Sequence, residues 1–353
     1  SVRALDYLSP VFYGGTLFVL ALLPFIGCGA GTARSTKSWV CIGGQTIGQP
    51  SELAKIAVVI MLAKALSSRS EAPRSLFDLW QPALVVAVPW VLIMLQPDLG
   101  TGLVFVGIFF AMLFWAGTNW RLLVLAASPA ISLVLAFSTQ LWGAWFIALI
   151  LLVYWTKPFI GESIAVVAAN LATGVAAPLI WERLDPYQQR RLLVFLDPSS
   201  DPLKGGYHVL QSQIAVGSGG LFGKGFTQGT QKRLAFLPEQ QTDFIFPVVA
   251  EELGLLGVLV ALALFAWLMM RCIRVAGRSQ NAFASFVAFG LVSMLFIHVV
   301  ENVGMTIGVM PIAGIPLPFF SYGGSFMLAC WIAIGILVRL SLEGRGRADT
   351  MVI

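Results

Sequence analysis

Residues 246–275 read FPVVAEELGLLGVLVALALFAWLMMRCIRV, and this stretch decides the class of fold. Its charged residues, Glu251, Glu252, Arg271 and Arg274, lie towards the two ends and leave the middle apolar. A helix needs about 20 apolar residues to cross the hydrocarbon core of a bilayer. The stretch is therefore predicted to form a membrane-spanning helix.

The composition of the whole chain agrees with this prediction. Of 353 residues, 58% are hydrophobic and 11% are charged, and the mean hydropathy is +0.85. Soluble domains carry roughly a quarter charged residues, so this chain has too few to cover a water-facing surface. The formal net charge of +5 does not indicate nucleic-acid binding, because the basic residues do not cluster as such a surface requires.

Counting apolar runs of sufficient length predicts an all-α polytopic membrane protein with about ten transmembrane helices. The chain has no internal repeat and no low-complexity tract, so residues 1–353 are expected to form a single domain. The predicted spans are Pro10–Gly27, Gln49–Leu66, Leu76–Leu95, Thr101–Ala116, Trp120–Phe137, Leu141–Trp155, Ile160–Trp181, Phe246–Val275, Ala282–Gly304 and Gly323–Leu340.

Basic residues orient these spans. Lysine and arginine recur in alternate gaps, which by the positive-inside rule face the cytoplasm; they are Arg69, Arg74, Arg121, Lys157, Arg271, Arg274, Arg278, Arg339, Arg345 and Arg347. An even number of spans then places both termini on the cytoplasmic side. The first apolar run, Pro10–Ile26, has no small-residue cleavage site and is expected to stay as a helix rather than act as a cleaved signal peptide.

A long loop, residues 182–245, separates the seventh and eighth predicted spans and faces outward. It contains seven basic residues on the side where positive charge should be rare, but long loops are exempt from that rule. Loops of more than about 15 residues are usually either functional or disordered. This loop also contains Tyr187, Phe195, Tyr207 and Phe222, so we predict a folded outward cap rather than a disordered segment.

The cysteine and histidine content limits the metal chemistry that the chain can perform. None of the four cysteines forms a CxxC pair, and the two histidines are too few for a multi-histidine site. Cys28 and Cys41 share one predicted outward loop. The sequence leaves open whether they form a disulfide there or remain free thiols, as is common in apolar chains.

Ionisable residues at membrane depth are costly and are usually paired or functional. Glu52 and Lys55 lie three residues apart, on one face of the second span, and fit a structural ion pair and a functional site equally well. Asp98 precedes the fourth span and is expected to cap that helix. Four further polar residues could face the interior and either hydrogen-bond between helices or relay protons: Glu251, Glu252, His298 and Glu301.

Asp243 lies where the polar loop enters the eighth span, in the stretch LPEQQTDFIF of residues 237–246. Partial desolvation at such a place raises the pKa of a carboxylate towards the range of a general base. Glu239 places a second carboxylate four residues earlier. The alternative is that Asp243 only caps the helix, and position alone does not separate the two interpretations.

Two glycine-rich or proline-rich segments complete the candidates. Residues 217–225, GSGGLFGKG, fail as a Walker A motif because Gly225 follows Lys224 where serine or threonine is needed. Flexible backbone amides beside Lys224 can still hold an anion. The turn-rich segment 311–324 precedes the last span, and irregular backbone at that depth is tolerated only where it is buried or lines a cavity.

Four segments together resemble the SEDS proteins (shape, elongation, division, sporulation). They are QPSELAK at 49–55, QPDLGT at 96–101, the run from Gln211 through Gly225 to TDFIF at 242–246, and PLPFFSYGGS at 316–325. Their order and spacing, with the plan of ten spans, cover nearly the whole chain. Within the family, GMTIG at 304–308 followed by GIPLP at 314–318 looks more like RodA than like FtsW.

The resemblance implies a peptidoglycan glycosyltransferase that polymerises lipid II for cell-wall elongation and cell shape. It also implies a class B penicillin-binding protein as transpeptidase partner, further membrane proteins of the elongation complex, and the bacterial cytoplasmic (inner) membrane. The family's catalytic aspartate falls on Asp243. The chain departs from the family at Gln241, where histidine is frequent, at Phe326, where serine is common, and at Ser38, where a basic residue is frequent.

The resulting hypothesis assigns Asp243 as the general base. Stabilisers for the departing pyrophosphate are expected among Lys224, Arg191 and Arg183, and a divalent cation, Mg²⁺ or Mn²⁺, is a further candidate. Other expected substrate contacts are Glu239, Gln211, Ser212 and Ser325. Two rival functions remain open: a transporter that flips lipid II, for which Glu52, Lys55 and Glu301 are suited, and a non-catalytic scaffold for the transpeptidase.

Overall fold

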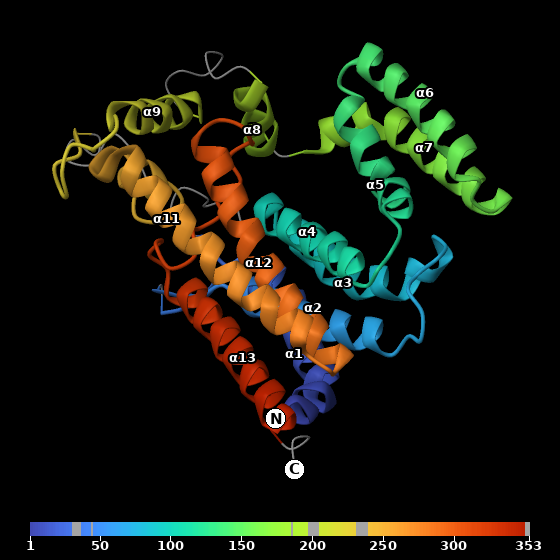
Figure 1. Ribbon diagram of the computed structural model, residues 1–353. Helices are drawn as coiled ribbons and strands as arrows, with labels where there is room; N and C mark the ends of the chain where they lie inside the picture. Colours follow the sequence, from blue (N-terminus) through green and yellow to red (C-terminus); the bar gives the residue numbers. More distant parts are fainter. Residues whose placement is uncertain (30–36, 44, 185, 197–204, 231–238, 350–353) are drawn as a thin grey trace.

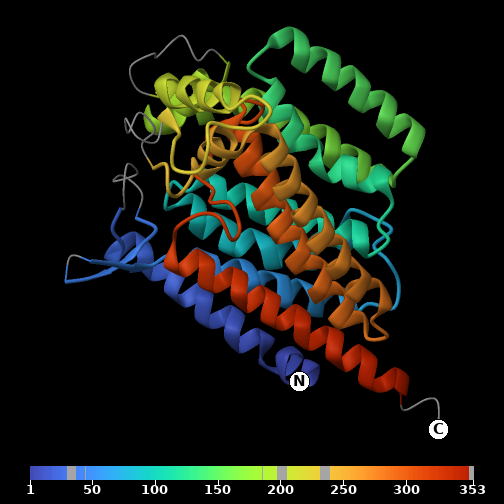
Figure 2. The same cartoon turned by 60° about the vertical axis from the view of Figure 1, so that its left-hand side comes forward.

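The computed structural model describes residues 1–29, 37–43, 45–184, 186–196, 205–230 and 239–349. Over these residues the chain is almost entirely helical (Figure 1). Helices α8 (Pro186–Leu196) and α9 (Gly205–Ser218) lie at the end of the molecule opposite to the N-terminus and to the end of α13 (Gly324–Asp349), as Figures 1 and 2 both show.

The centre of the molecule is formed by α2 (Pro50–Ser67), α4 (Leu99–Trp115) and α12 (Ala282–Thr306), which contact one another. Residues of α2 such as Ile56, Val59 and Leu62 are almost fully buried on every side of the helix. A helix that is apolar all round is a buried helix. Because this part of α2 is enclosed, its buried charged residues, Glu52 and Lys55, cannot reach lipid or water and must find partners inside the protein.

The surrounding helices bury fewer residues and expose large apolar side chains, as lipid-facing helices do. They are α1 (Val2–Ile26), α3 (Trp80–Met94) with the preceding 3-10 turn η1 (Phe77–Leu79), α11 (Ile245–Arg278) and α13. Helix α11 is interrupted at Gly254, where φ is +67°. The glycine-rich segment packs on this interruption, because Lys224 N donates to Glu251 O at 2.9 Å and Leu255 N donates to Gly220 O at 2.9 Å.

Helices α5 (Trp120–Leu135), α6 (Thr139–Thr156) and α7 (Ile160–Arg183) form a group of their own, drawn in green to one side in Figures 1 and 2. Buried Asn170 of α7 joins this group. Its Nδ2 donates to Ser128 Oγ at 2.8 Å, and its carbonyl accepts from Ser132 Oγ at 3.0 Å. Trp142 of α6 donates to the same Ser132 hydroxyl at 2.8 Å.

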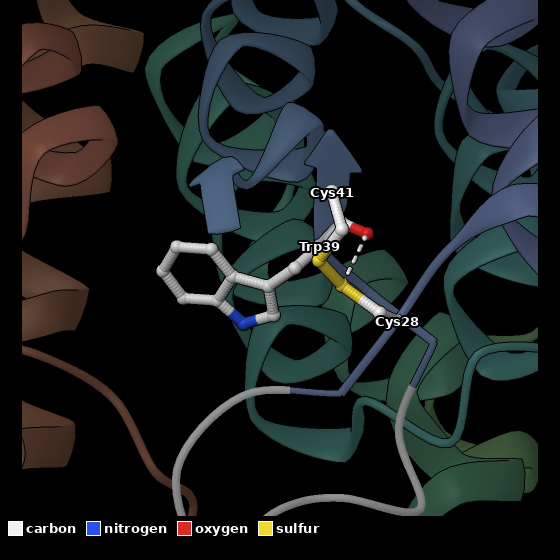
Figure 3. Close-up of a disulfide and its surroundings, with 3 residues drawn as sticks. All are labelled: Cys28, Trp39 and Cys41. Carbon is white, nitrogen blue, oxygen red and sulfur yellow. Dashed lines mark hydrogen bonds between the residues drawn. A yellow bond between two sulfur atoms is a disulfide. The ribbon is translucent and has the colours of Figure 1, made fainter. Parts of the chain in front are cut away.

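A small hairpin follows α1. Strand β1 (Val40–Ile42) pairs antiparallel with β2 (Gln45–Gly48), and Cys28 pairs with Trp39 through two backbone hydrogen bonds of 2.9 and 3.1 Å. A disulfide joins Cys28 and Cys41 (Figure 3). The interpretation of these two cysteines as free thiols is therefore wrong, because the hairpin brings their Cα atoms to 6.2 Å, within the range that a disulfide spans.

The prediction of a multi-pass helical membrane protein is confirmed. Among the described residues, seven helices are long and apolar enough to cross a bilayer: α1, η1 with α3, α6, α7, α11, α12 and α13. Helices α4 and α5 are apolar but shorter, and α2 contains Glu52, Lys55 and Lys64. The total of ten spans and the outward position of residues 182–245 stay predictions, as does the single domain.

Two local predictions about helix ends have clear outcomes. Asp98 is the N-cap of α4, and its side chain accepts a hydrogen bond from Thr101 N, as expected. Helix α11 begins at Ile245, and its N-cap residue is Phe244, with no side-chain cap. Asp243 therefore does not cap α11, and the alternative that it serves only as a helix cap is wrong.

Candidate active site

The candidate site lies where residues 239–244 lead into α11. Glu239 adopts a φ of +51° and starts a tight turn. Thr242 N and Phe244 N both donate to Glu239 O, at 3.1 and 3.3 Å. Thr242 Oγ1 adds a hydrogen bond of 3.3 Å to Glu239 Oε2. This turn presents Asp243 as the last residue before the N-cap and leaves its carboxylate free from the helix-capping role.

The backbone of this turn is held by the loop between α12 and α13, residues 307–323. Ser321 Oγ donates to Thr242 O at 2.6 Å and accepts from Leu317 N at 2.7 Å. Tyr322 N donates to Gln241 O at 2.7 Å. The turn-rich segment that the sequence singled out is thus the support of the candidate base.

Asn302 of α12 completes this support and was missed by the sequence reasoning. Its Nδ2 donates to both Asp243 O, at 2.8 Å, and Ile315 O, at 2.7 Å. The side chain is fully buried. The sequence offers one weak signal for Asn302: it is a polar residue directly after Glu301, within a predicted span whose polar residues could face the interior.

Arg191 of α8 is the basic residue that the structure brings against Asp243. The ideal Cβ position of Gly314 lies 3.4 Å from Asp243 Oδ2 and 3.5 Å from Arg191 Nη2. Arg191 Nη1 also donates to Ala313 O at 3.3 Å. Gly314 has a φ of +71°, a conformation that favours glycine, and its lack of a side chain lets both charged groups approach the same point of the loop.

The environment raises the pKa of the Asp243 carboxyl to about 6. Burial is the main cause, and the negative charges of Glu239 and Asp98 add to it, whereas the Arg191 guanidinium opposes the rise. A base with a pKa near the working pH is deprotonated often enough to act and basic enough to accept a proton. The arrangement therefore suits general-base chemistry.

Lys224 lies elsewhere, within a clamp on α11. Its Nζ is 2.7 Å from Glu251 Oε1 and donates to Thr230 Oγ1 at 2.6 Å. Thr230 donates to the same Glu251 oxygen from its backbone N and from Oγ1, each at 2.9 Å. Glu251 is completely buried. These contacts fasten the glycine-rich segment, with Lys224 and Thr230, to α11.

The remaining predicted site residues have separate places. Arg183 is exposed at the end of α7, and Gln211 is half-buried on α9. Ser212 Oγ donates to Thr306 O at 2.6 Å and joins α9 to α12. Ser325 Oγ accepts from Gln49 N at 3.3 Å, at the start of α2. Only Glu239 and Arg191 adjoin Asp243 among the predicted contacts that the structure describes.

The second polar group lies within the bundle. Glu52 Oε2 and Lys55 Nζ are 2.7 Å apart, with side chains 4% and 1% exposed, so the predicted pair exists and is buried. Lys55 Nζ also lies 2.8 Å from His298 Nε2. Gln49 Nε2 donates to Asp98 Oδ2 at 3.1 Å and joins the start of α2 to the start of α4.

A metal site is not evident from the donor atoms. No three or more histidine, cysteine, aspartate or glutamate side chains group together as metal ligands in the parts of the chain that the structure describes. The divalent cation suggested by the sequence therefore has no ligand set of this kind among the described residues.

Comparison with known proteins gives concordant results. The chain matches the family profile FTSW_RODA_SPOVE, described as cell cycle proteins, over residues 1–150 and 143–346. It is 37% identical to the peptidoglycan glycosyltransferase MrdB of Escherichia coli K12, over 96% of this chain and 79% of that protein. It is 36% identical to the peptidoglycan glycosyltransferase RodA of Treponema pallidum, over 87% of this chain and 77% of the relative.

Solved structures extend this likeness to the fold. A chain of a peptidoglycan synthase complex, described as coordinating polymerization and crosslinking, superposes with a TM-score of 0.69 at 29% identity, covering 97% of this chain and 83% of that one. The rod shape determining protein RodA of Thermus thermophilus superposes with a TM-score of 0.60 at 27% identity, covering 97% and 80%. This chain therefore belongs to the FtsW/RodA/SpoVE family of cell cycle proteins, the SEDS proteins, and is RodA-like.

Proposed function

We propose that this protein is a peptidoglycan glycosyltransferase that polymerises lipid II into glycan strands, with Asp243 as general base. Relatives in three organisms that match most of the chain bear the name peptidoglycan glycosyltransferase. The observation that supports the role of Asp243 is its place beside Arg191, in surroundings that raise its pKa to about 6.

In the proposed reaction, the carboxylate of Asp243 accepts the proton of a sugar hydroxyl on the acceptor substrate. The hydroxyl oxygen forms a bond to the anomeric carbon of the lipid-linked donor. The bond from that carbon to the pyrophosphate oxygen breaks, and polyprenyl pyrophosphate leaves with the electron pair. Pyrophosphate is a good leaving group without protonation, so one base and a source of positive charge suffice.

Arg191 is the preferred stabiliser of the developing negative charge. Its guanidinium lies against the same glycine as Asp243, and arginine binds phosphate oxygens through two parallel donors. Lys224 is engaged by the buried Glu251 carboxylate, which makes it a weaker candidate than the sequence suggested. Arg183 is exposed and would need to contact the substrate from the end of α7.

The proposal includes a membrane setting and a partner. We place the protein in the bacterial cytoplasmic membrane with both termini in the cytoplasm, so that Asp243 and the helices α8 and α9 face outward, where the cell wall is built. One structural neighbour belongs to a complex that coordinates polymerization with crosslinking. By this analogy a class B penicillin-binding protein is the expected partner, together with other membrane proteins of the elongation complex.

One observation favours the rival function of lipid II transport: Glu52, Lys55 and His298 form a polar group buried within the bundle. Transporters place essential groups near the middle of the membrane. Helix α8, which carries Arg191, lies instead at the end of the bundle where α9 is (Figure 1), and Arg191 contacts the same loop as Asp243. This arrangement fits an enzyme acting on head groups.

The test separates the three functions in one preparation. The protein is reconstituted with the transpeptidase into liposomes that contain labelled lipid II, and glycan polymer and lipid II translocation are both measured. Polymer without translocation supports the proposal. Translocation without polymer would establish the transporter, and neither activity, in a complex that still binds the transpeptidase, would establish the scaffold.

A further inference from the structure

His298 gives the buried pair on α2 a connection to the candidate active site. Lys55 Nζ lies 2.7 Å from Glu52 Oε2, in an ion pair, and 2.8 Å from His298 Nε2. An ammonium group can only donate, so Nε2 must present its lone pair to the lysine. The hydrogen of the neutral ring then lies on Nδ1, which faces Pro316 O at 3.3 Å and donates to it. Both ring nitrogens are therefore used, and the two partners select a single tautomer.

The ring is also held by packing. Its centroid lies 4.8 Å from that of Phe326, and Lys55 Nζ lies 5.7 Å from the same Phe326 ring. His298 and Lys55 are both almost fully buried. A side chain held by two hydrogen bonds and by an aromatic ring has little room to move, so a shift of one of its partners also shifts the other.

The far end of this connection is the loop that holds Asp243. His298 and Asn302 lie four residues apart on α12, on one face of the helix. His298 binds Pro316 O, while Asn302 binds the adjacent Ile315 O and also Asp243 O. The same loop then reaches the residue before the base, through the hydrogen bond from Ser321 Oγ to Thr242 O.

We propose that His298 is a positioning residue for the polymerisation reaction. The buried Glu52–Lys55 pair fixes His298, His298 fixes the loop at Pro316, and the loop fixes the Asp243 turn through Ser321. His298 touches neither substrate nor the reacting atoms. The inference rests on the proposed function. The sequence left open whether the Glu52–Lys55 pair is structural or functional, and through these contacts the pair supports catalysis.

The test replaces His298 by leucine, glutamine and asparagine in the full chain bound to its transpeptidase. Leucine removes both hydrogen bonds, and displacement of a catalytic group by about 1 Å can reduce turnover by about 100-fold. We expect His298→Leu to lower kcat by about 10- to 100-fold and to leave the KM for lipid II within about twofold. His298→Gln, which keeps an acceptor for Lys55 and a donor for Pro316, should restore most of kcat.

A matched control separates positioning from packing. Leu295 is buried on the same helix and takes no part in the chain of contacts, so Leu295→Ala measures the effect of a loosened core. At equal loss of thermal stability, only His298→Leu should lose kcat. Hydrogen exchange at the amides of Leu317 and Tyr322, which are bonded in the parent protein, should accelerate in His298→Leu and not in Leu295→Ala.

Three results would overturn the proposal: an unchanged kcat in His298→Leu, an equal loss in Leu295→Ala, or an equal loss of kcat in the glutamine and leucine variants. If the leucine variant does not fold, His298→Asn decides, because its amide is polar but too short for both partners; a kcat like that of the parent would then reject the role. If the parent itself makes no polymer, the proposed function has failed, which is a different result.

Discussion

Asp243 combines three properties of a general base: it is partly buried, it lies beside another carboxylate, and it does not cap its helix. Burial and the charge of Glu239 raise its pKa to about 6, although Arg191 acts in the opposite direction. The protonated form of Asp243 is therefore populated just below neutral pH. Most aspartates are fully ionised at that pH, so the charge of Asp243 changes with pH where theirs does not.

This pKa predicts the pH dependence of polymerisation. The base must be deprotonated, so kcat/KM should fall as the pH drops through about 6 and reach a plateau above it. The measurement is the rate of lipid II polymerisation between pH 5 and 8. Replacing Glu239 by glutamine removes a charge that raises the pKa of Asp243, so the acid limb should move to lower pH. A rate independent of pH over this interval would contradict the assignment.

Gly314 provides a second prediction at the residue scale. In Gly314→Ala the new methyl group would lie 3.4 Å from Asp243 Oδ2 and 3.5 Å from Arg191 Nη2, on a backbone with φ of +71°. We expect kcat to fall by about tenfold or more, because alanine is strained at this φ and the loop that supports Asp243 must shift. The control is Gly335→Ala on α13, where a Cβ meets nothing within 4 Å. Equal activity in the two variants would show that the backbone of this loop does not have to stay in place for catalysis.

At the scale of elements, the clamp between the glycine-rich segment and α11 is expected to contribute to stability rather than to catalysis. Lys224→Met removes a cation from the buried Glu251 carboxylate, which Thr230 and Ser218 still approach. Removing one partner of a buried pair costs about 3–5 kcal/mol. Because Lys224 is 32% exposed, we expect about 1–3 kcal/mol.

The measurement is thermal unfolding of the detergent-solubilised protein, with a double-mutant cycle as control. Glu251→Gln combined with Lys224→Met removes the buried negative charge as well and should recover part of the lost stability. If Lys224→Met instead retains its stability and loses polymerisation, Lys224 contacts the substrate as the sequence first suggested.

The helices themselves were predictable from the sequence, whereas the contacts between them were not. Apolar runs such as residues 246–275 determine helices locally, and the Asp98 cap follows from residue type and place. His298 contacts Lys55 across a sequence separation of 243 positions, and Asn302 contacts Asp243 across a separation of 59 positions. Hydropathy does not specify which helix faces which, so these partners and the clamp on Lys224 required the structure.

For the whole molecule, helices α8 and α9 lie opposite to the N-terminus (Figure 2). Gln228 follows α9 along the chain, and Gln280 lines a cavity together with Ser1 and Val2, so we predict that the two glutamines are labelled from opposite sides. Gln228 and Gln280 are both exposed. Cysteine in place of Gln228 should react with a membrane-impermeant maleimide added to whole cells whose outer envelope is permeable, and cysteine in place of Gln280 should react only after lysis.

The native cysteines leave a low background for this experiment. Cys28 and Cys41 form a disulfide, and Cys272 and Cys330 are buried. Labelling of Gln280→Cys in intact cells, with protection of Gln228→Cys, would invert the proposed orientation. It would also place Asp243 on the side where no cell wall is made.

The proposed reaction depends on the carboxylate of Asp243, and it is tested by the polymerisation rate of Asp243→Asn in the complex with the transpeptidase. Asparagine keeps the shape of the side chain and cannot accept the proton, so the rate should fall by about 100-fold or more. Glu71→Gln, at an exposed ion pair with Arg74, serves as the matched control and should polymerise at the rate of the parent. A folded, partner-bound Asp243→Asn protein that polymerises as fast as Glu71→Gln would contradict the assignment of Asp243 as the general base.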